Sequence, residues 1–137
     1  LDRRALREYI FQFPEARHSL EQITHPAIRQ SIIQQSQQTE SPYVILVSPL
    51  LFETNQHELV QHTLLIDADE QTQLQRASQR DGQTEEQIRK IIAAQMPRTQ
   101  KQQLANDVVL NDGLLEHLHK QLKPLHLNYL QRAEQIG

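Results

Sequence analysis

The segment from Tyr43 to Glu53, with the sequence Tyr-Val-Ile-Leu-Val-Ser-Pro-Leu-Leu-Phe-Glu, constrains the fold most strongly. Its first part is a continuous apolar run without alternating polar residues, which is typical of a strand buried on both faces of a parallel sheet. Pro49 ends the run and begins an apolar loop that finishes at Glu53. Because ligands of such sheets bind beyond the carboxyl ends of the strands, we expect this loop to lie near a ligand.

The bulk composition bounds the class of protein. The chain has 137 residues, enough for one compact domain with a hydrophobic core. Its net charge of -3, from 14 basic and 17 acidic side chains, gives no general nucleic-acid-binding surface. The sequence has no cysteine, no stretch like a membrane span and no signal-peptide pattern. We therefore expect a cytoplasmic protein with no membrane or nucleic-acid partner. The start at Leu1 suggests that an upstream segment is absent.

Helical and strand patterns alternate along the chain. Apolar steps of three and four, with caps at Asp69 and Thr84, predict helices at 2–12, 15–24, 26–38, 70–80, 84–96, 98–105 and beyond 113. The break between the second and third of these helices is placed at Pro26. Short apolar runs predict strands at 43–48, 62–67 and 107–110. This order predicts an α/β fold: a parallel sheet with helices on both faces, lacking the opening β-α unit of a doubly wound fold.

The segment from residue 76 to residue 101 is basic, with six basic side chains against three acidic ones. Arg76 and Arg80 are four residues apart and share one face of a helix. A basic helical segment between two strands suits a lid that closes over polyphosphate, whose charge guanidinium groups neutralise. An ordinary solvated helical hairpin explains the same pattern, so both interpretations stay open at this point.

Polar residues at strand ends are the other candidates for chemistry. Glu53 could orient a metal-bound water or a substrate hydroxyl, or it could cap a turn or pair with an arginine. Asn111 begins an Asn-Asp-Gly turn and could also contact a base edge. The seven histidines show no metal-ligand spacing, so no metal site is expected within the chain.

Phosphate binding through a glycine-rich loop is excluded by the glycine positions. A P-loop requires glycines before a Lys-Ser/Thr pair so that backbone amides can approach the phosphates. The three glycines are Gly82, Gly113 and Gly137, and none of them precedes such a pair. Any phosphate that these 137 residues bind would therefore be held by side chains.

The order and spacing of several segments resemble the dephospho-CoA kinase family, the P-loop kinases that complete coenzyme A synthesis. The segments are Leu1-Asp2-Arg3-Arg4 with Ile10-Phe11, His25-Pro26-Ala27-Ile28-Arg29, Pro49-Leu50-Leu51-Phe52-Glu53, Gln73 to Gly82, Ala94-Gln95-Met96-Pro97 and Ala105 to Gly113. The departures, Ser48 and Asn106, are minor. The family adds an N-terminal strand, a P-loop and an acidic residue after it. The chain thus resembles the rear two-thirds of such a kinase.

The resemblance implies ATP-dependent phosphorylation of the 3′-hydroxyl of dephospho-CoA, with Mg²⁺. By position, Arg76, Arg80 and Arg98 would act from the lid on ATP, Asn111 would lie near adenine, and Glu53 is the candidate catalytic residue. The expected acceptor-binding residues are Arg4, His25, Pro49, Leu50, Leu51 and Phe52. The expected parts are acceptor-binding helices at 1–42, core strands and a helix at 43–82, a lid at 83–105, and a closing strand and helix at 106–137.

Without a P-loop, residues 1–137 alone are expected to be inactive. The competing hypothesis is a non-enzymatic helical domain that binds a partner protein through the apolar faces of 15–38 and 113–134. A strand at 43–48 without a neighbour would present an open edge, which also favours self-association.

Overall fold

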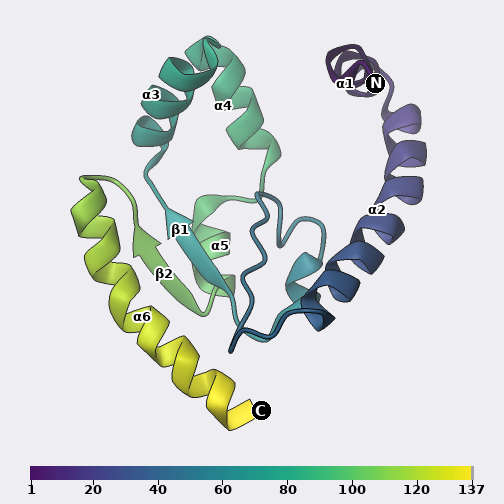
Figure 1. The fold of residues 1–137 in the computed structure, drawn as a ribbon. Coiled ribbons are helices and arrows are strands. Elements are labelled where there is room, and N and C mark those ends of the chain that lie inside the picture. The colour runs from purple at the N-terminus through teal and green to yellow at the C-terminus, as the bar shows by residue number, and fades with distance from the viewer. Residues whose placement is uncertain (137) are drawn as a thin grey trace. The chain divides into compact units, whose positions relative to one another are not determined.

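A computed structural model describes residues 1–136, which form two compact units (Figure 1). The first unit is Leu1–Glu40, and the second begins at Ser41.

The first unit is a pair of helices, α1 (Arg3–Gln12) and α2 (Pro14–Gln37). Asp2 caps α1, since its carboxylate accepts a hydrogen bond from the amide of Ala5 at 3.1 Å. Phe13 separates the two helices, and the centre of its ring lies 4.7 Å from that of Tyr9. Neither helix has a buried residue, so local contacts hold this unit together.

The predicted break at Pro26 is wrong, because α2 runs through this proline without interruption. A proline inside a helix lacks one amide donor and costs about 3 kcal/mol relative to alanine. The helix has 24 residues, so most of its backbone bonds do not involve Pro26. The hydroxyl of Thr24 adds a bond to the carbonyl of Leu20 at 2.9 Å in the turn before it.

The second unit is built on two parallel strands, β1 (Leu64–Asp67) and β2 (Asp107–Leu110). Their register pairs Leu64 with Asp107 and Asp67 with Leu110. The strand predicted at 107–110 is confirmed, and the strand predicted at 62–67 is shorter by two residues at its start.

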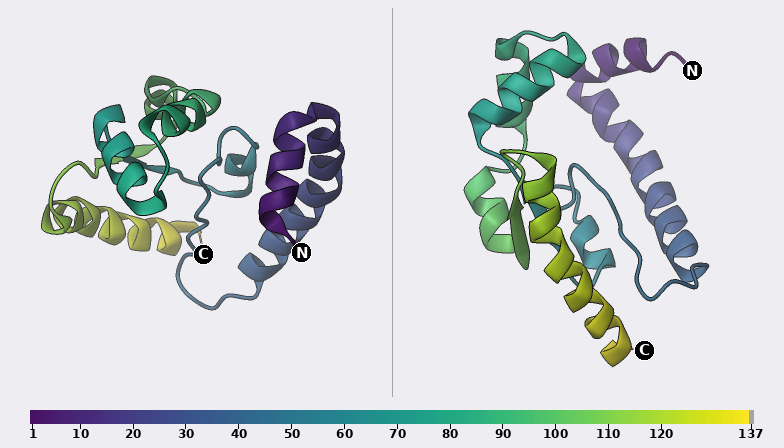
Figure 2. Two further views of the ribbon diagram at one scale, coloured as in Figure 1. Left: turned by 90° about the horizontal axis from the view of Figure 1, so that it is seen from above. Right: turned by 60° about the vertical axis from the view of Figure 1, so that its left-hand side comes forward.

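Helices surround the two strands, with α5 against β1 and α6 against β2 (Figure 1). The helices α3 and α4 pack against each other and lie side by side in the views of Figure 2. The helices of this unit are η1 (Gln56–Leu59, a 3-10 helix), α3 (Glu70–Asp81), α4 (Glu85–Ala94), α5 (Arg98–Leu104) and α6 (Leu115–Ile136). Asp69 and Thr84 cap α3 and α4 as predicted, and Thr84 forms the expected capping box with Gln87.

The core of the described residues is small. Its buried apolar side chains are Leu74 of α3, Ile88 of α4 and Val109 of β2. Two polar residues are buried with them, Thr63 and Asp67. Asp67 is a charge buried in a small core, so it requires partners that compensate its loss of hydration.

The strand predicted at 43–48 does not form among residues 1–136, although this apolar segment is present. A strand needs a neighbour for its amides and carbonyls, and the sheet of the described residues contains β1 and β2 alone. Ile45 and Val47 are accordingly 72% and 87% exposed. The prediction of a parallel sheet is confirmed, but its extent was overestimated.

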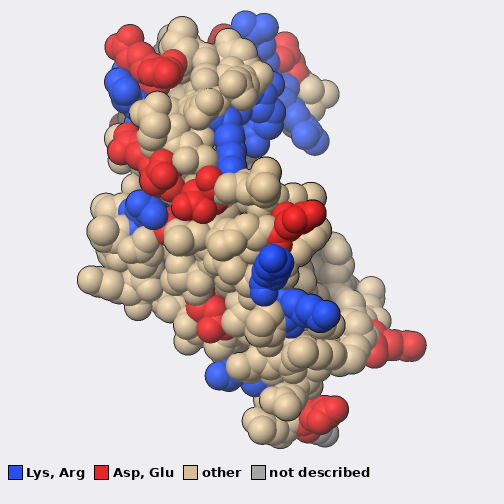
Figure 3. All heavy atoms as spheres, turned by 90° about the vertical axis from the view of Figure 1, so that its left-hand side faces the viewer, with Lys and Arg blue, Asp and Glu red and all other residues tan. Residues whose placement is uncertain are grey.

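The described residues include no helix with the length and apolarity needed to cross a membrane. Acidic and basic side chains both occur on the face drawn in Figure 3, in keeping with the net charge of -3.

Candidate functional site

The carboxyl ends of β1 and β2 lie next to each other and bring together several of the predicted residues. The amide of Asn111 donates to the carbonyl of Asp67 at 2.7 Å, which extends the parallel ladder by one step. The chain then turns at residues 111–113 after β2 and enters α3 through Asp69 after β1. This is the edge at which parallel sheets bind ligands.

Arg98, a predicted lid residue, is held at this edge by a buried carboxylate. Its Nε donates to Oδ1 of Asp67 at 2.7 Å, and Nε2 of Gln102 donates to the other oxygen at 2.7 Å. Burial would raise the pKa of Asp67, but the hydrogen bonds from Arg98 and Gln102 and the charge of Arg98 hold this pKa below its usual value. Asp67 is therefore a carboxylate at neutral pH, and Arg98 is a cation beside it.

Arg76 reaches the same edge from α3. Its Nη1 donates to the carbonyl of Asn111, and its Nη2 lies 3.5 Å from the carbonyl of Gly113. The structure thus brings Arg76 and Asn111 together and gives Arg76 a role in holding the turn at 111–113. Arginines from two different helices, α3 and α5, converge on adjacent strand ends.

Arg80 is placed differently, near the end of α3. Its Nε and Nη2 donate to the two carboxylate oxygens of Asp81 at 2.8 and 2.9 Å. The hydrogen bonds and charge of Arg80 outweigh a small effect of burial and lower the pKa of Asp81. Gly82 follows with a φ of 65°, a left-handed conformation that ends the helix.

Glu53 contacts the connection between α4 and α5. Its Oε2 accepts from the amide of Met96 at 3.1 Å and lies 3.5 Å from Nζ of Lys101. Its other oxygen, Oε1, is buried without a hydrogen-bond partner among residues 1–136. The bonded amide is 43 residues away rather than in the next turn, and the nearby cation is a lysine rather than an arginine. The catalytic role of Glu53 stays a prediction.

The apolar loop before Glu53 turns tightly. The amide and the hydroxyl of Thr54 both donate to the carbonyl of Leu50, at 3.1 and 2.7 Å. Phe52 packs against the ring of His57, with 5.3 Å between ring centres. Pro49 and Leu50 are exposed, whereas Leu51 and Phe52 are half-buried.

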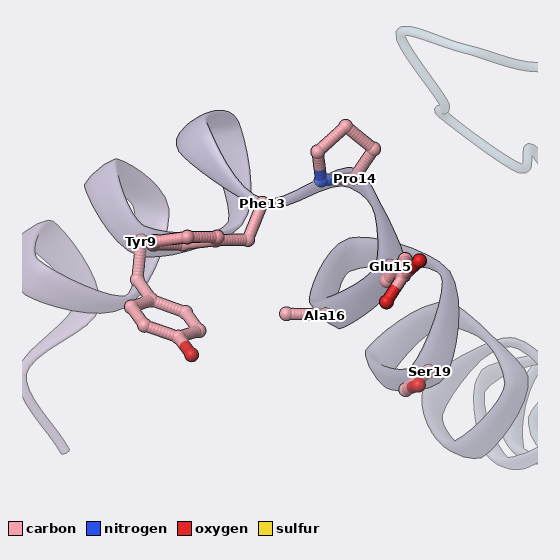
Figure 4. A pocket seen from close by; sticks show the side chains of 6 residues that line it. All are labelled: Tyr9, Phe13, Pro14, Glu15, Ala16 and Ser19. Carbon is pink, nitrogen blue, oxygen red and sulfur yellow. The ribbon is translucent and has the colours of Figure 1, made fainter.

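The predicted acceptor residues of the first unit, Arg4 and His25, are exposed. Nε of Arg4 lies 3.6 Å from a carboxylate oxygen of Glu8, one turn further along α1. A shallow groove of about 630 Å³ lies where α1 meets α2, and the rings of Tyr9 and Phe13 form one side of it (Figure 4). The structure does not bring Arg4 or His25 into this groove.

The sequence interpretation missed Asp67, Gln102 and Lys101 as members of this site. The available signal was the sequence Leu-Leu-Ile-Asp at 64–67, in which a carboxylate ends an apolar strand directly before the predicted ligand edge. No group of three or more His, Asp or Glu side chains among residues 1–136 could hold a metal ion.

Parallel strands flanked by helices, with arginines at the carboxyl ends, define an α/β protein with a cationic edge. Comparisons with known proteins identify the family. The family model described as CoaE, dephospho-CoA kinase, matches residues 1–117. The chain belongs to the dephospho-CoA kinase family, which confirms the resemblance of its sequence segments.

Individual relatives agree with this assignment. The dephospho-CoA kinase of Acinetobacter baylyi is 70% identical over 130 residues, which are 95% of this chain and 67% of that protein. The dephospho-CoA kinase of Psychrobacter cryohalolentis is 45% identical over 139 residues, which are 99% of this chain and 60% of that protein. The chain therefore spans 60% to 67% of the lengths of these relatives.

A solved structure shares the fold. The crystal structure of TT1252 from Thermus thermophilus matches with a TM-score of 0.82 and 35% sequence identity. The match covers 93% of this chain and 67% of that one.

Proposed function

We propose that this chain provides the acceptor-binding, core and lid parts of a dephospho-CoA kinase. Such an enzyme transfers the γ-phosphoryl group of ATP to the 3′-hydroxyl of dephospho-CoA. The observation that carries the proposal is the convergence of Arg76 and Arg98 on the adjacent ends of β1 and β2. Phosphoryl transfer depends on positioning and on charge neutralisation, which arginines supply.

Specific roles follow for the predicted residues. Arg98 would contact ATP phosphates, Arg76 would hold the turn at 111–113, and Asn111 would lie near adenine. Arg80 would approach the phosphates from α3, which requires that it leave Asp81. Glu53 would fix the connection between α4 and α5.

The acceptor would be bound by the remaining predicted residues. In the second unit these are the loop residues Pro49, Leu50, Leu51 and Phe52, and in the first unit they are Arg4 and His25. Support for this part of the proposal comes from the family motifs that contain these residues.

The metal that such kinases use with ATP is not provided for by the described side chains. Residues 1–136 contain no cluster of three or more His, Asp or Glu side chains with suitable geometry, so they do not fit a dedicated magnesium site. What these residues offer to a nucleotide is positive charge, chiefly from Arg76, Arg80 and Arg98.

Residues 1–137 alone should not transfer phosphate. Their sequence contains no P-loop, and removing the amide donors and lysine of such a loop eliminates the main stabilisation of the transferring group. An ADP-release assay with ATP and dephospho-CoA is expected to give no turnover above the rate without protein. Calorimetric titration with dephospho-CoA would measure acceptor binding separately.

The decisive experiment is a fusion in which the N-terminal P-loop part of the Acinetobacter baylyi kinase precedes residues 1–137. The fusion should release ADP in a manner that depends on dephospho-CoA. The matched control carries the P-loop lysine replaced by alanine and should be inactive. A folded fusion without activity would contradict the proposal and favour a non-enzymatic helical domain, for which the exposed apolar side chains of α2, such as Ile23, provide a surface.

A further inference from the structure

Asp67, the last residue of β1, is a buried carboxylate that receives its side-chain hydrogen bonds from a single helix. Asp67 is 3% exposed. A carboxylate removed from water to this extent is costly unless charged or polar donors compensate it. Both of its side-chain donors, Arg98 and Gln102, come from α5 and are four residues apart, so they lie on one face of that helix. Asp67 thereby fixes both the orientation of α5 and the side-chain conformation of Arg98.

Asp67 binds the guanidinium of Arg98 through Nε, the nitrogen nearest to the aliphatic part of the arginine side chain. The hydrogen bond uses Nε, and neither Nη atom of Arg98 makes a hydrogen bond to another residue among 1–136. The side chain is 41% exposed, so these two nitrogens remain accessible. Arg80 provides a contrast, because Asp81 occupies both its Nε and its Nη2.

A second carboxylate supports the same helix. Glu53 accepts from the amide of Met96, two residues before Arg98, and lies near Lys101, three residues after it. Glu53 and Asp67 thus hold the start of α5 from two separate segments of the chain. A guanidinium on so constrained a helix loses little freedom when it binds an anion.

We propose that Asp67 is a positioning residue that presents the two Nη groups of Arg98 to the oxygens of a nucleotide phosphate. This inference rests on the proposed function and names the residue through which Arg98 is prepared for it. Asp67 does not touch the phosphate. The negative charge of Asp67 lowers the affinity for an anion. The hydrogen bond from Arg98 to Asp67 raises this affinity, because it orients the guanidinium.

The test is whether removing the charge of Asp67 weakens or strengthens the binding of triphosphate. Inorganic triphosphate is titrated into the 137-residue chain at low salt, and binding is followed by the ¹⁵N signals of the arginine side chains. Asp67→Asn should weaken triphosphate binding by about tenfold although it removes a negative charge, because a charge-assisted hydrogen bond that orients Arg98 is lost. The control is Asp112→Asn, which removes an exposed carboxylate near Arg98 without touching its hydrogen bond, and should slightly strengthen binding.

A double-mutant cycle shows whether Asp67 acts through Arg98. In an Arg98→Gln background, Asp67→Asn should have no further weakening effect, whereas independent or general structural effects would persist. Gln102→Ala leaves both charges in place and should weaken binding in the same direction by a smaller factor, which provides a second variant if Asp67→Asn folds poorly.

Three results would overturn the inference. They are stronger triphosphate binding by Asp67→Asn, equal weakening in both backgrounds, and Arg98 signals in the unsubstituted chain that do not respond to triphosphate. Failure of the proposed function is a separate outcome. It would appear as an inactive fusion protein, and it leaves the triphosphate result unchanged.

Discussion

The two ends of the same pair of strands each carry a carboxylate, and the two are used differently. At the carboxyl ends, Asp67 binds an arginine whose outer nitrogens remain accessible. At the amino ends, Oδ2 of Asp107 lies 2.6 Å from Nε2 of His62 and accepts from the hydroxyl of Tyr129 at 2.8 Å. The first cluster leaves part of its cation exposed, whereas the second satisfies its polar groups internally.

The amino-end cluster is closed by further contacts. The ring of Tyr129 lies edge-on to the rings of His62 and Tyr43, with 5.3 and 5.9 Å between centres. Beside it, Oδ1 of Asn106 accepts from the amide and the hydroxyl of Thr63 at 2.8 and 3.0 Å. These bonds fix the register of β1 and β2 and attach α6 to the sheet. From this comparison we propose that one end of the strands serves binding and the other serves stability.

The largest expected effect is a loss of activity when Arg98, at the carboxyl ends of the strands, is replaced. In the active fusion protein, Arg98→Ala should lower kcat by about 100- to 1,000-fold, because a charged donor to the transferring phosphate is lost. The free energy of unfolding should change much less. The matched control is Arg132→Ala, an arginine of α6 whose Nε bonds to Asn128 at 3.2 Å. Steady-state kinetics of both variants would contradict the division if they lost equal activity.

The next effect tests the amino end. Asp107→Ala should lower the free energy of unfolding by about 2 kcal/mol, because it leaves the half-buried donors His62 and Tyr129 without their acceptor. Urea unfolding of the 137-residue chain measures this change. Asp112→Ala, in the exposed turn after β2, is the control and should cost less than about 0.5 kcal/mol. A kcat of the fusion protein that falls more with Asp107→Ala than with Arg98→Ala would reverse the assignment of the two ends.

The sequence predicted the local elements well and the long-range pairing poorly. The caps at Asp69 and Thr84 and the strand at 107–110 depend on neighbouring residues, and the structure confirms them. The strand at 43–48 depends on a neighbour, and the apolar pattern cannot indicate whether one is present. The prediction that a helix ends at Pro26 was wrong. A proline indicates a local cost in helix stability, but it does not indicate whether a long helix tolerates that cost.

The candidate site shows the same limit. Arg98 was predicted from its motif, but its partner Asp67 lies 31 positions away in the sequence and was interpreted only as the end of a strand. The partner of Glu53 was likewise unknown, since nothing local connects that loop to Met96 and Lys101. Such contacts arise from the packing of α5 and the residues before it on β1 and on the loop at 49–53, which the spacing of residues does not encode.

The lowered pKa values of Asp67 and Asp107 predict a loss of stability in acid. Burial raises the pKa of Asp107, but the hydrogen bonds from His62 and Tyr129 outweigh it and leave this pKa below its usual value, as for Asp67. A carboxyl whose pKa is lower in the folded state stabilises the protein. This stabilisation is complete at pH values above the pKa in the unfolded chain, about 3.9. This stabilisation is lost as the pH falls through the folded values. The urea midpoint should therefore drop below about pH 4, and Asp67→Asn and Asp107→Asn should each flatten the drop. A pH profile unchanged by both substitutions would contradict this origin.

The amino-end cluster also predicts a loss of stability in alkali. Burial, the hydrogen bond to Asp107 and the charge of Asp107 raise the pKa of Tyr129 well above its usual value. The unfolded phenol ionises near pH 10 while the folded one stays neutral, so unfolding becomes more favourable as the pH rises past about 10. Tyr129→Phe should remove this dependence, and Tyr9→Phe, on an exposed face of α1, serves as its control. Stability curves for the two variants that have the same alkaline slope would exclude Tyr129 as its source.

The smallest expected effect concerns the apolar segment before the loop, which belongs to neither end of the strands. Residues 43–48 are not part of the sheet among residues 1–136, and Val47 is 87% exposed. An apolar segment whose backbone is not paired in a sheet favours pairing with a second copy. We therefore expect the 137-residue chain to form dimers weakly at high concentration, and Val47→Lys to shift it towards monomer, as measured by light scattering across a dilution series. Lysine placed at the exposed Leu127 of α6 is the matched control, since it removes an apolar side chain away from the unpaired segment. If Leu127→Lys reduced dimer formation as much as Val47→Lys, general hydrophobicity rather than the open edge would be responsible.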